Sequence, residues 1–361
     1  MALRITATIF LCAPIVCMLL GATGEPSGSA GVQSAVDHAV HRAIYEMHAP
    51  GVAIAVEIDG RIVVERGYGL RSLSSKAPVT TNTHFEIASV SKQFTAAAVL
   101  QLAERHQLNL DDPLGKYVPE YAVGAAVTIR ELLYQTSGIP NFTEGNDFML
   151  VASTHKPSLQ AILDCISGKP LAFPPGSDWA YSNTNYVLLA YVIERVSGET
   201  YNQYIRRHVF GPAEMGNSGF ASEESGFSDM ATGYHPGTGG ITPSPHVDEG
   251  WAPGAGTIVS TLGDIIKWDH ALLQGRIVSL RLVALMRDAS STSAGKSTGY
   301  GMGWYIDTEK GHERIWHNGA TFGSSAMNAT FPSDKEIIVV LDNNVGVDAE
   351  TIASHVFDAT H

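Results

Sequence analysis

Cysteine is scarce in this chain, with three among 361 residues. Cys12 and Cys17 lie in an N-terminal segment that we expect to be removed, so Cys165 is left alone in the mature chain. A lone cysteine excludes an internal disulfide. Because Cys165 stands in a run typical of a helix face, we interpret it as a buried structural residue, with a nucleophile as the alternative.

Basic residues are also few, with 23 Lys and Arg against 36 Asp and Glu and a net charge of −13 at pH 7. Removing residues 1–24 takes away one arginine and no acid, which makes the charge −14. Such an acidic surface argues against nucleic acid and anionic membranes as partners.

The N-terminus is uncharged apart from Arg4 over residues 1–24, and small residues surround position 22. This pattern resembles a signal peptide over residues 1–24, so we expect a secreted or periplasmic protein. The alternative is an uncleaved anchor, because the apolar run approaches the ~20 residues of a membrane span. Contact with a membrane is expected only if this segment is retained.

Motifs for metals and phosphates are missing. His312 and His317 are one residue too far apart for the zinc-binding His-Glu-x-x-His pattern, which needs histidines four apart on a helix. Gly299, Gly301 and Gly303 alternate with large apolar residues as in a strand, and no Gly-Lys-Ser follows them. We therefore infer no metal and no cofactor.

The two ends of the chain carry strand patterns. Residues 51–58 and 61–69 flank Asp59-Gly60, a pair that accommodates the positive φ angles of a tight hairpin turn. Further strands are expected at residues 299–306, 314–316, 324–331 and 336–341.

Helical patterns fill the middle third of the chain. We expect helices in residues 128–134 and 186–196, another at 261–273 and a closing helix at 348–357. Two irregular stretches are a flexible lead-in at 25–32 and a long surface loop at 233–256, close to a site.

This order predicts an α+β fold, in which one antiparallel sheet is built from both chain ends, is flanked by helices and carries a mostly helical insertion. After the signal peptide, a single domain would occupy residues 25–361. Its sheet subdomain would span about 33–105 and 255–361, and its helical subdomain about 106–254.

The spacing Ser-x-x-Lys occurs three times, beginning at Ser89, Ser153 and Ser293. Residues three apart share a helix face, which lets a lysine activate a hydroxyl without histidine. The context of Ser153 and Ser293 indicates loops, whereas Ser89 opens a long apolar helix whose backbone N–H groups favour developing negative charge. Ser89 with Lys92 is therefore the candidate nucleophile and base, the alternative being a helix N-cap and a surface lysine.

Tyr181 and Asn183 stand at a loop edge before a helix, where a phenol and an amide can converge on a cleft. Each also has a simpler interpretation, a packing residue for Tyr181 and a helix N-cap for Asn183.

Five motifs in order resemble the serine β-lactamase-like superfamily, and most closely its class C β-lactamase, D-alanyl-D-alanine peptidase and esterase group. They are residues 85–96, 128–142, 181–183, 300–304 and 316–323. The resemblance implies that Ser89 is acylated, that Lys92 accepts its proton, and that Tyr181 cooperates as base and leaving-group acid. It further implies that Asn183 orients Lys92 and the substrate.

The last motif departs from the family. His317, Asn318 and Gly319 fall where many members carry Lys-Thr-Gly, and this match implies that the N–H groups of Ala320 and Ser89 form the oxyanion hole. Histidine is largely neutral at pH 7, so strong recognition of a substrate carboxylate is not expected.

The leading hypothesis is thus an exported serine hydrolase that forms an acyl-serine on a small-molecule or peptide substrate, namely an ester, a D-amino acid peptide or amide, or a β-lactam. The alternative is a catalytically silent protein of the same fold that binds or senses cell-wall-type fragments.

Overall fold

A seven-stranded antiparallel sheet forms the centre of the molecule, with strand order β3-β2-β1-β12-β11-β10-β9. The structure is a computed structural model and describes residues 27–361 except 145–147, 149–150, 153 and 246–247. The signal peptide expected at residues 1–24 lies outside the described residues and stays a prediction. No helix in the described part of the chain is long and apolar enough to cross a membrane.

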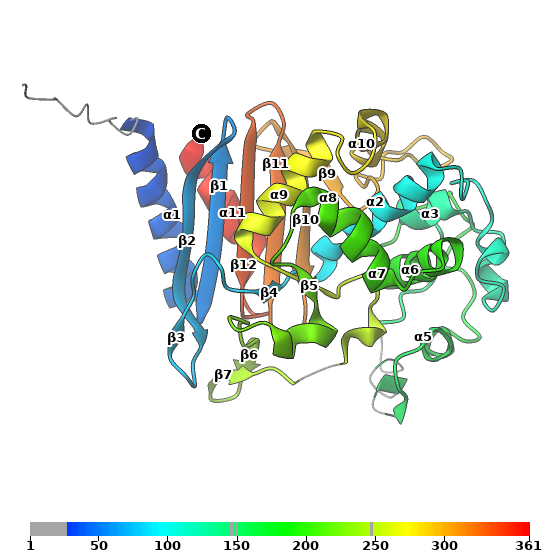
Figure 1. Cartoon of the computed structure of the whole chain (residues 1–361), viewed down its shortest axis with the longest axis horizontal. Helices are drawn as coiled ribbons and strands as arrows, with labels where there is room; N and C mark the ends of the chain where they lie inside the picture. Colours follow the sequence, from blue (N-terminus) through cyan, green and yellow to red (C-terminus); the bar gives the residue numbers. More distant parts are fainter. Residues whose placement is uncertain (1–26, 145–147, 149–150, 153, 246–247) are drawn as a thin grey trace, which may run out of the picture.

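The strands come from both ends of the chain, as Figure 1 shows by the blue and orange to red arrows lying side by side. They are β1 (Gly51–Ile58), β2 (Arg61–Ser72), β3 (Ala77–Pro78), β9 (Tyr305–Glu309), β10 (His312–Ala320), β11 (Ser325–Phe331) and β12 (Glu336–Asp342). A second, small sheet joins β4 (Phe85–Glu86), β8 (Ile258–Ser260) and β5 (Gly219–Phe220), and β6 (Tyr234–Gly237) pairs with β7 (Gly240–Pro243).

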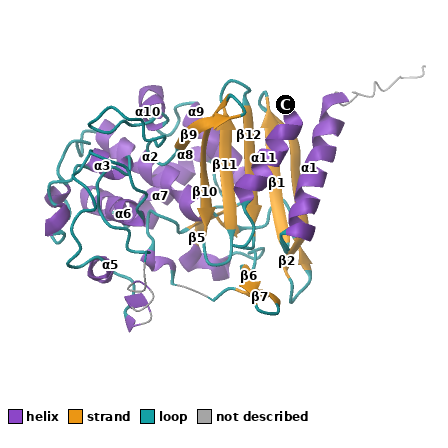
Figure 2. Cartoon of the chain, turned by 180° about the vertical axis from the view of Figure 1, so that it is seen from behind, coloured by secondary structure: helices purple, strands orange, loops and turns teal. Residues whose placement is uncertain are grey.

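Helices cover the sheet on both faces (Figure 2). They are α1 (Ser27–Glu46), α2 (Ser91–Glu104), α3 (Ile129–Leu133), α5 (Leu159–Cys165), α6 (Asn183–Ser197), α7 (Tyr201–Ile205), α8 (Gly211–Ala213), α9 (Leu262–Leu273), α10 (Leu280–Met286) and α11 (Ala349–Thr360). The α+β class with an antiparallel sheet from both chain ends is therefore confirmed.

Alternation along β12 explains why both faces are covered. Ile338 and Val340 pack with α1 and α11, while Val339 and Leu341 point to the opposite face and join the larger core around α2. Successive side chains of a strand point to opposite faces, so an apolar run such as β12 needs helices on both.

The hairpin turn has the predicted conformation, because Asp59 and Gly60 have φ angles of 51° and 72°. Helix α9 begins one residue after the predicted start, because Thr261 is its N-cap, and α6 ends at Gly198 in the left-handed conformation, with a φ of 75°. These turn and cap residues fix where the elements start and stop.

Three local predictions need correction. Residues 27–32 belong to α1 rather than a flexible lead-in, since Val36, Val40 and Ala43 continue the helix along a buried face. The loop expected at 233–256 contains the short β6–β7 hairpin. In the strand expected at 299–306, only Tyr305 and Ile306 fall in β9, because the glycines before them turn the chain.

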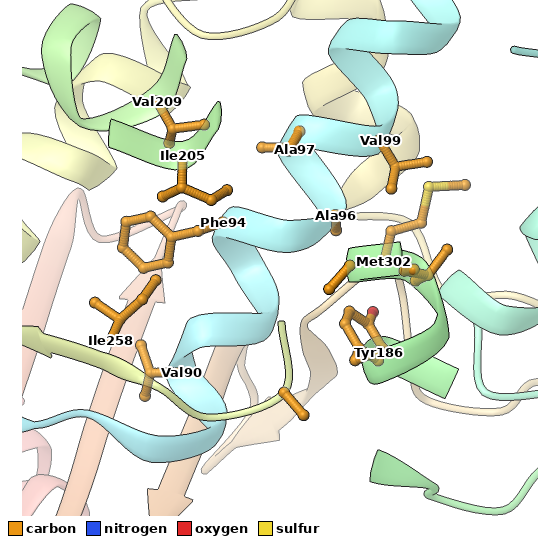
Figure 3. Packing of buried hydrophobic residues seen from close by; sticks show 14 of the residues in the cluster. Val90, Phe94, Ala96, Ala97, Val99, Tyr186, Ile205, Val209, Ile258 and Met302 are labelled. Atoms are coloured by element: carbon orange, nitrogen blue, oxygen red, sulfur yellow. The ribbon is translucent and has the colours of Figure 1, made fainter. Parts of the chain in front are cut away.

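Helix α2 runs through the larger core, and the candidate nucleophile Ser89 stands just before its first residue. On one side Phe94 lies beside Ile205, Val209 and Ile258, and on the other Ala96 and Val99 face Tyr186 and Met302 (Figure 3). Phe94 also stacks on Trp268 of α9, with 4.1 Å between ring centroids. This packing fixes α2 relative to the sheet.

Asp269 of α9 is a buried carboxyl that links this core to the sheet. Its Oδ1 accepts a hydrogen bond from Asn328 Nδ2 at 3.1 Å, while Oδ2 has no hydrogen-bond partner among the described residues. Burial raises the pKa of Asp269 to about 7, although Asn328 and the charge of Arg287 favour the ionised form. The folded protein therefore binds a proton here that the unfolded chain, with a carboxyl pKa near 3.8, does not hold at pH 5.

We predict that Asp269→Asn reduces the loss of stability between pH 5 and pH 8. Because the pKa of Asp269 is raised in the folded protein, this carboxyl stabilises the fold. Its contribution to the free energy of unfolding is complete below pH 3.8 and is lost as pH rises through about 7. In urea unfolding, the free energy of unfolding of the wild type should fall by roughly 2 to 3 kcal/mol more than that of the variant between pH 5 and pH 8. The matched control is Asp59→Asn, an exposed carboxylate paired with Lys335. An equal loss in wild type and Asp269→Asn would contradict the assignment.

Candidate active site

Ser89 sits in a tight turn between β4 and α2. It belongs to the short helix η1 (Ala88–Val90), which leads directly into α2. Ala88 has a φ of 48°, a left-handed conformation that is costly for a residue with a Cβ and is found mostly at functional sites. The turn leaves Ser89 partly exposed between two buried neighbours, Ala88 and Val90.

Lys92 is fully buried, one turn after Ser89, and its amine has three oxygen neighbours. Nζ lies 3.0 Å from Ser89 Oγ, 2.8 Å from Asn183 Oδ1 and 2.8 Å from the carbonyl oxygen of Ala255. The rings of Tyr181 and Tyr186 lie 4.9 and 5.6 Å from Nζ. Within the described residues, the amine forms no hydrogen bond or ion pair with a carboxylate.

Burial without a counter-ion lowers the pKa of Lys92 well below 10.5. A neutral amine has two N–H groups and one lone pair. The amide oxygen of Asn183 and the carbonyl oxygen of Ala255 can only accept, so they take the two N–H groups. The lone pair is then left facing Ser89 Oγ, where it can accept the hydroxyl proton.

Tyr181 approaches the same hydroxyl, because its phenol is close to Ser89 and its ring centroid lies 4.9 Å from Lys92 Nζ. Burial raises the pKa of Tyr181 well above 10, although the contact with Ser89 favours the phenolate. Its ring stacks on Tyr305 of β9, with 6.4 Å between centroids. Tyr181 is therefore a protonated phenol at neutral pH and can donate a proton close to Ser89.

Asn183 is the first residue of α6 rather than its N-cap, which is Ser182. While Oδ1 accepts from Lys92, Nδ2 donates to Thr143 Oγ1 at 3.1 Å, which fixes the orientation of the amide. The backbone N–H of Asn183 donates to Asn141 Oδ1 at 3.1 Å. The position of Lys92 thus depends on a chain of hydrogen bonds to the 141–143 loop.

His317 lies in the same region but is 1% exposed and contacts other aromatic residues. Nδ1 faces the carbonyl oxygen of Asn318, which can only accept, so Nδ1 carries the proton and Nε2 accepts from the Tyr300 hydroxyl at 3.1 Å. Burial lowers the pKa of His317 to about 3. The histidine is neutral throughout the physiological range, as the sequence predicts.

Gly319 lets β10 come close to the turn that holds Ser89. A Cβ at this position would lie 2.4 Å from the Ile87 oxygen and 2.9 Å from both Ala88 Cβ and Ser89 N, closer than real Cβ atoms come. The next residue, Ala320, is exposed and lines the same pocket as Ser89. The contact at Gly319 therefore places the backbone of β10 beside the nucleophile.

A pocket of 780 Å³ opens at Ser89. Asn183, Ala255 and Ala320 line it with Ser89, whereas Lys92, Tyr181 and His317 do not belong to its wall. One side is aromatic, because Phe142, Phe148 and Trp251 pack edge to face with centroid distances of 5.4 and 5.8 Å. The charged residues in the described wall are Glu86 and Asp248, both acidic.

The other candidate serines do not share these features. Ser293 is exposed in a loop, and Ser153 lies outside the described residues. The pattern Gly-x-Ser-x-Gly, typical of α/β-hydrolases, occurs at residues 295–299, but Ser297 is exposed and does not stand at a strand-to-helix turn. Cys165 is buried at the end of α5, in agreement with a structural role.

Two contributors to the site were not predicted from the sequence. The carbonyl of Ala255 comes from the stretch before β8, and no sequence motif marks a backbone oxygen. Tyr300 was expected only as a strand residue, yet it holds His317 and lies 6.4 Å from the Tyr181 ring. Tyr300 is the first residue of the family motif at residues 300–304.

The chain belongs to the Beta-lactamase family, whose sequence model matches residues 32–360. It is 31% identical over 299 residues to the putative penicillin-binding protein PbpX of Bacillus subtilis (strain 168), covering 82% of this chain and 71% of that one. It resembles the structure of the octameric penicillin-binding protein homologue from Pyrococcus abyssi with a TM-score of 0.79 and 27% identity, covering 90% of this chain and 76% of that one.

Protein flp of Staphylococcus aureus (strain MW2) is 30% identical over 320 residues, which is 86% of this chain. The alignment spans 63% of the length of that relative. The family and the fold agree with the resemblance in the motifs. Members of the Beta-lactamase fold family are serine hydrolases.

We predict that Gly319→Ala reduces acylation of Ser89. The added methyl group must push β10 away from the turn at Ser89, and a shift of about 1 Å in a reacting group can cost on the order of a hundredfold in rate. The measurement is the rate of covalent labelling by a fluorophosphonate, followed by intact mass. Gly216→Ala is the control, since no atom of the described part of the chain lies within 4 Å of its added Cβ. Equal labelling rates in both variants would refute the close-approach argument.

Proposed function

We propose that this chain is an exported serine hydrolase that forms an acyl-Ser89 intermediate and prefers substrates without a carboxylate beside the scissile bond. The observation that carries the proposal is the buried amine of Lys92, which has two fixed acceptors and a third contact at Ser89 Oγ. A binding protein has no use for a lysine desolvated against a hydroxyl.

In the acylation step, Ser89 Oγ bonds to the carbonyl carbon of the substrate and its proton passes to Lys92 Nζ. The backbone N–H groups of Ser89 and Ala320 stabilise the oxyanion of the tetrahedral intermediate. The bond to the leaving group then breaks, and the Tyr181 hydroxyl protonates the departing alkoxide or amine. Tyr181 regains a proton from Lys92, which returns the amine to its neutral form.

Deacylation uses the same groups in reverse. A water molecule gives a proton to Lys92 while its oxygen bonds to the acyl carbon, and Ser89 Oγ leaves with a proton delivered through Tyr181. The second product is a carboxylic acid. Asn183 contributes by holding Lys92 in place, and His317 contributes by positioning Tyr300 beside Tyr181, not by contacting the substrate.

The charge of the pocket supports the substrate preference. No Lys, Arg or His belongs to its described wall, which instead carries Glu86 and Asp248. His317, where many relatives have lysine, is buried and neutral. A substrate carboxylate would meet no cation there, so β-lactams are disfavoured, while uncharged esters and D-amino acid amides fit the aromatic side formed by Phe142, Phe148 and Trp251.

We predict measurable hydrolysis of short-chain aryl esters and D-amino acid amides, with turnover of penicillins and cephalosporins at least about tenfold lower in kcat/KM. The experiment is a panel of these substrates with wild type and Ser89→Ala, under conditions that correct for spontaneous ester hydrolysis. A cephalosporin hydrolysed faster than every ester and amide would refute the preference.

The panel also tests the alternative function. If wild type and Ser89→Ala gave equal rates on every substrate, and neither a fluorophosphonate nor a penicillin modified Ser89, the hydrolase proposal would be wrong. A silent binding protein of the same fold would then be the better account.

A further inference from the structure

A second cluster of reactive side chains lies at the other end of the sheet. His312 begins β10, Asp334 stands in the turn between β11 and β12, and His361 follows α11. One ligand atom from each lies within 4.8 Å of the others. Because β10 is extended, His312 is about 26 Å from Ala320 and the active-site pocket.

The Asp334 carboxylate lies between the two imidazole rings. His312 Nδ1 is 2.9 Å from Oδ2 and 3.0 Å from Oδ1, and His361 Nε2 is 3.3 Å from Oδ1. These separations are close to the ~3.3 Å expected between two ligand atoms that are each 2.0 to 2.1 Å from a tetrahedral zinc ion. A small shift of the three side chains would therefore admit a metal.

Glu336, the first residue of β12, gives an independent indication of a cation. It is 2% exposed, and neither of its carboxylate oxygens accepts a hydrogen bond among the described residues. A buried carboxylate that accepts no hydrogen bond of normal length is costly to ionise. Its Oε2 lies 3.6 Å from Nδ1 of His361, whose Nε2 faces Asp334. A carboxylate behind a histidine is the usual outer-shell arrangement at zinc sites.

The ring of His361 is also held in place. It stacks on buried Phe357, with 4.2 Å between centroids, and its Nδ1 lies 3.1 Å from Thr360 Oγ1. Since Nδ1 faces Thr360 and Glu336, Nε2 is the nitrogen that remains for a ligand. The orientation required of a metal-binding histidine is thus present before any metal arrives.

The geometry points to a zinc-class divalent metal site formed by His312 Nδ1, Asp334 and His361 Nε2, with Glu336 as the outer-shell carboxylate of His361. Imidazole and carboxylate ligands suit Zn²⁺, and a water molecule would complete a tetrahedron. Bound metal would tie the end of α11 to the strands at the far end of the sheet.

The test is metal binding by protein without a polyhistidine tag, stripped with chelator and dialysed at pH 7.5. We expect one Zn²⁺ per chain by calorimetry, a higher melting temperature with zinc, and visible absorption typical of tetrahedral Co²⁺ when cobalt replaces it. His312→Ala and Asp334→Asn should each weaken zinc binding at least about tenfold. Asp334→Asn keeps the shape of the side chain, so its effect is separable from misfolding.

His355→Ala is the matched control, because it removes a histidine of the same helix α11 that is not part of the cluster. It should bind zinc as wild type does. Absence of stoichiometric binding in wild type, or unchanged affinity in His312→Ala and Asp334→Asn, would overturn the proposal and leave a hydrogen-bonded His–Asp–His cluster. Ester hydrolysis does not enter this test, so it is independent of the proposed function.

Discussion

The burial of the Lys92 amine beside Ser89 is the constraint on which the rest of the site depends. Taking an amine out of water without a counter-ion favours its neutral form, and the oxygens of Asn183 and Ala255 then determine where the lone pair points. Each contributor comes from a different part of the chain, α2, the start of α6 and the stretch before β8. The direction of the Lys92 lone pair therefore depends on how these three segments pack.

The core supplies that packing through a continuous network between α2 and the sheet. Gln93, next to Lys92, accepts hydrogen bonds from Trp268 Nε1 and Asn328 Nδ2, at 3.0 and 3.2 Å, and Asn328 also donates to Asp269. On the opposite side, the absence of a side chain at Gly319 brings β10 against the turn that holds Ser89. The nucleophile is thus fixed between a helix anchored in the core and a strand that cannot tolerate a Cβ at its point of contact.

Much of this arrangement was predictable, because it rests on short-range signals. Asp59-Gly60 marked the hairpin, and the Ser89 motif marked the start of a buried helix. Lys92, Tyr181 and Asn183, which the sequence groups with Ser89, lie close to it in the structure. What it could not supply was the direction of each group: His317 matches a motif that contacts substrate in relatives with lysine, yet tertiary packing turns it toward Tyr300. The Ala255 carbonyl and the cluster at His312 depend on long-range contacts that have no local pattern.

The protonation state of Lys92 is the central claim, and the pH dependence of Ser89 acylation tests it most directly. Single-turnover labelling with an uncharged aryl ester should accelerate as pH rises through one ionisation well below 10.5, because the neutral amine is the active form, and should then reach a plateau. Tyr181, with its raised pKa, should add no decline up to pH 10. Lys92→Ala should remove the ionisation from the profile. A wild-type rate that keeps rising without a plateau through pH 10 would show that Lys92 is protonated at neutral pH and would contradict the account.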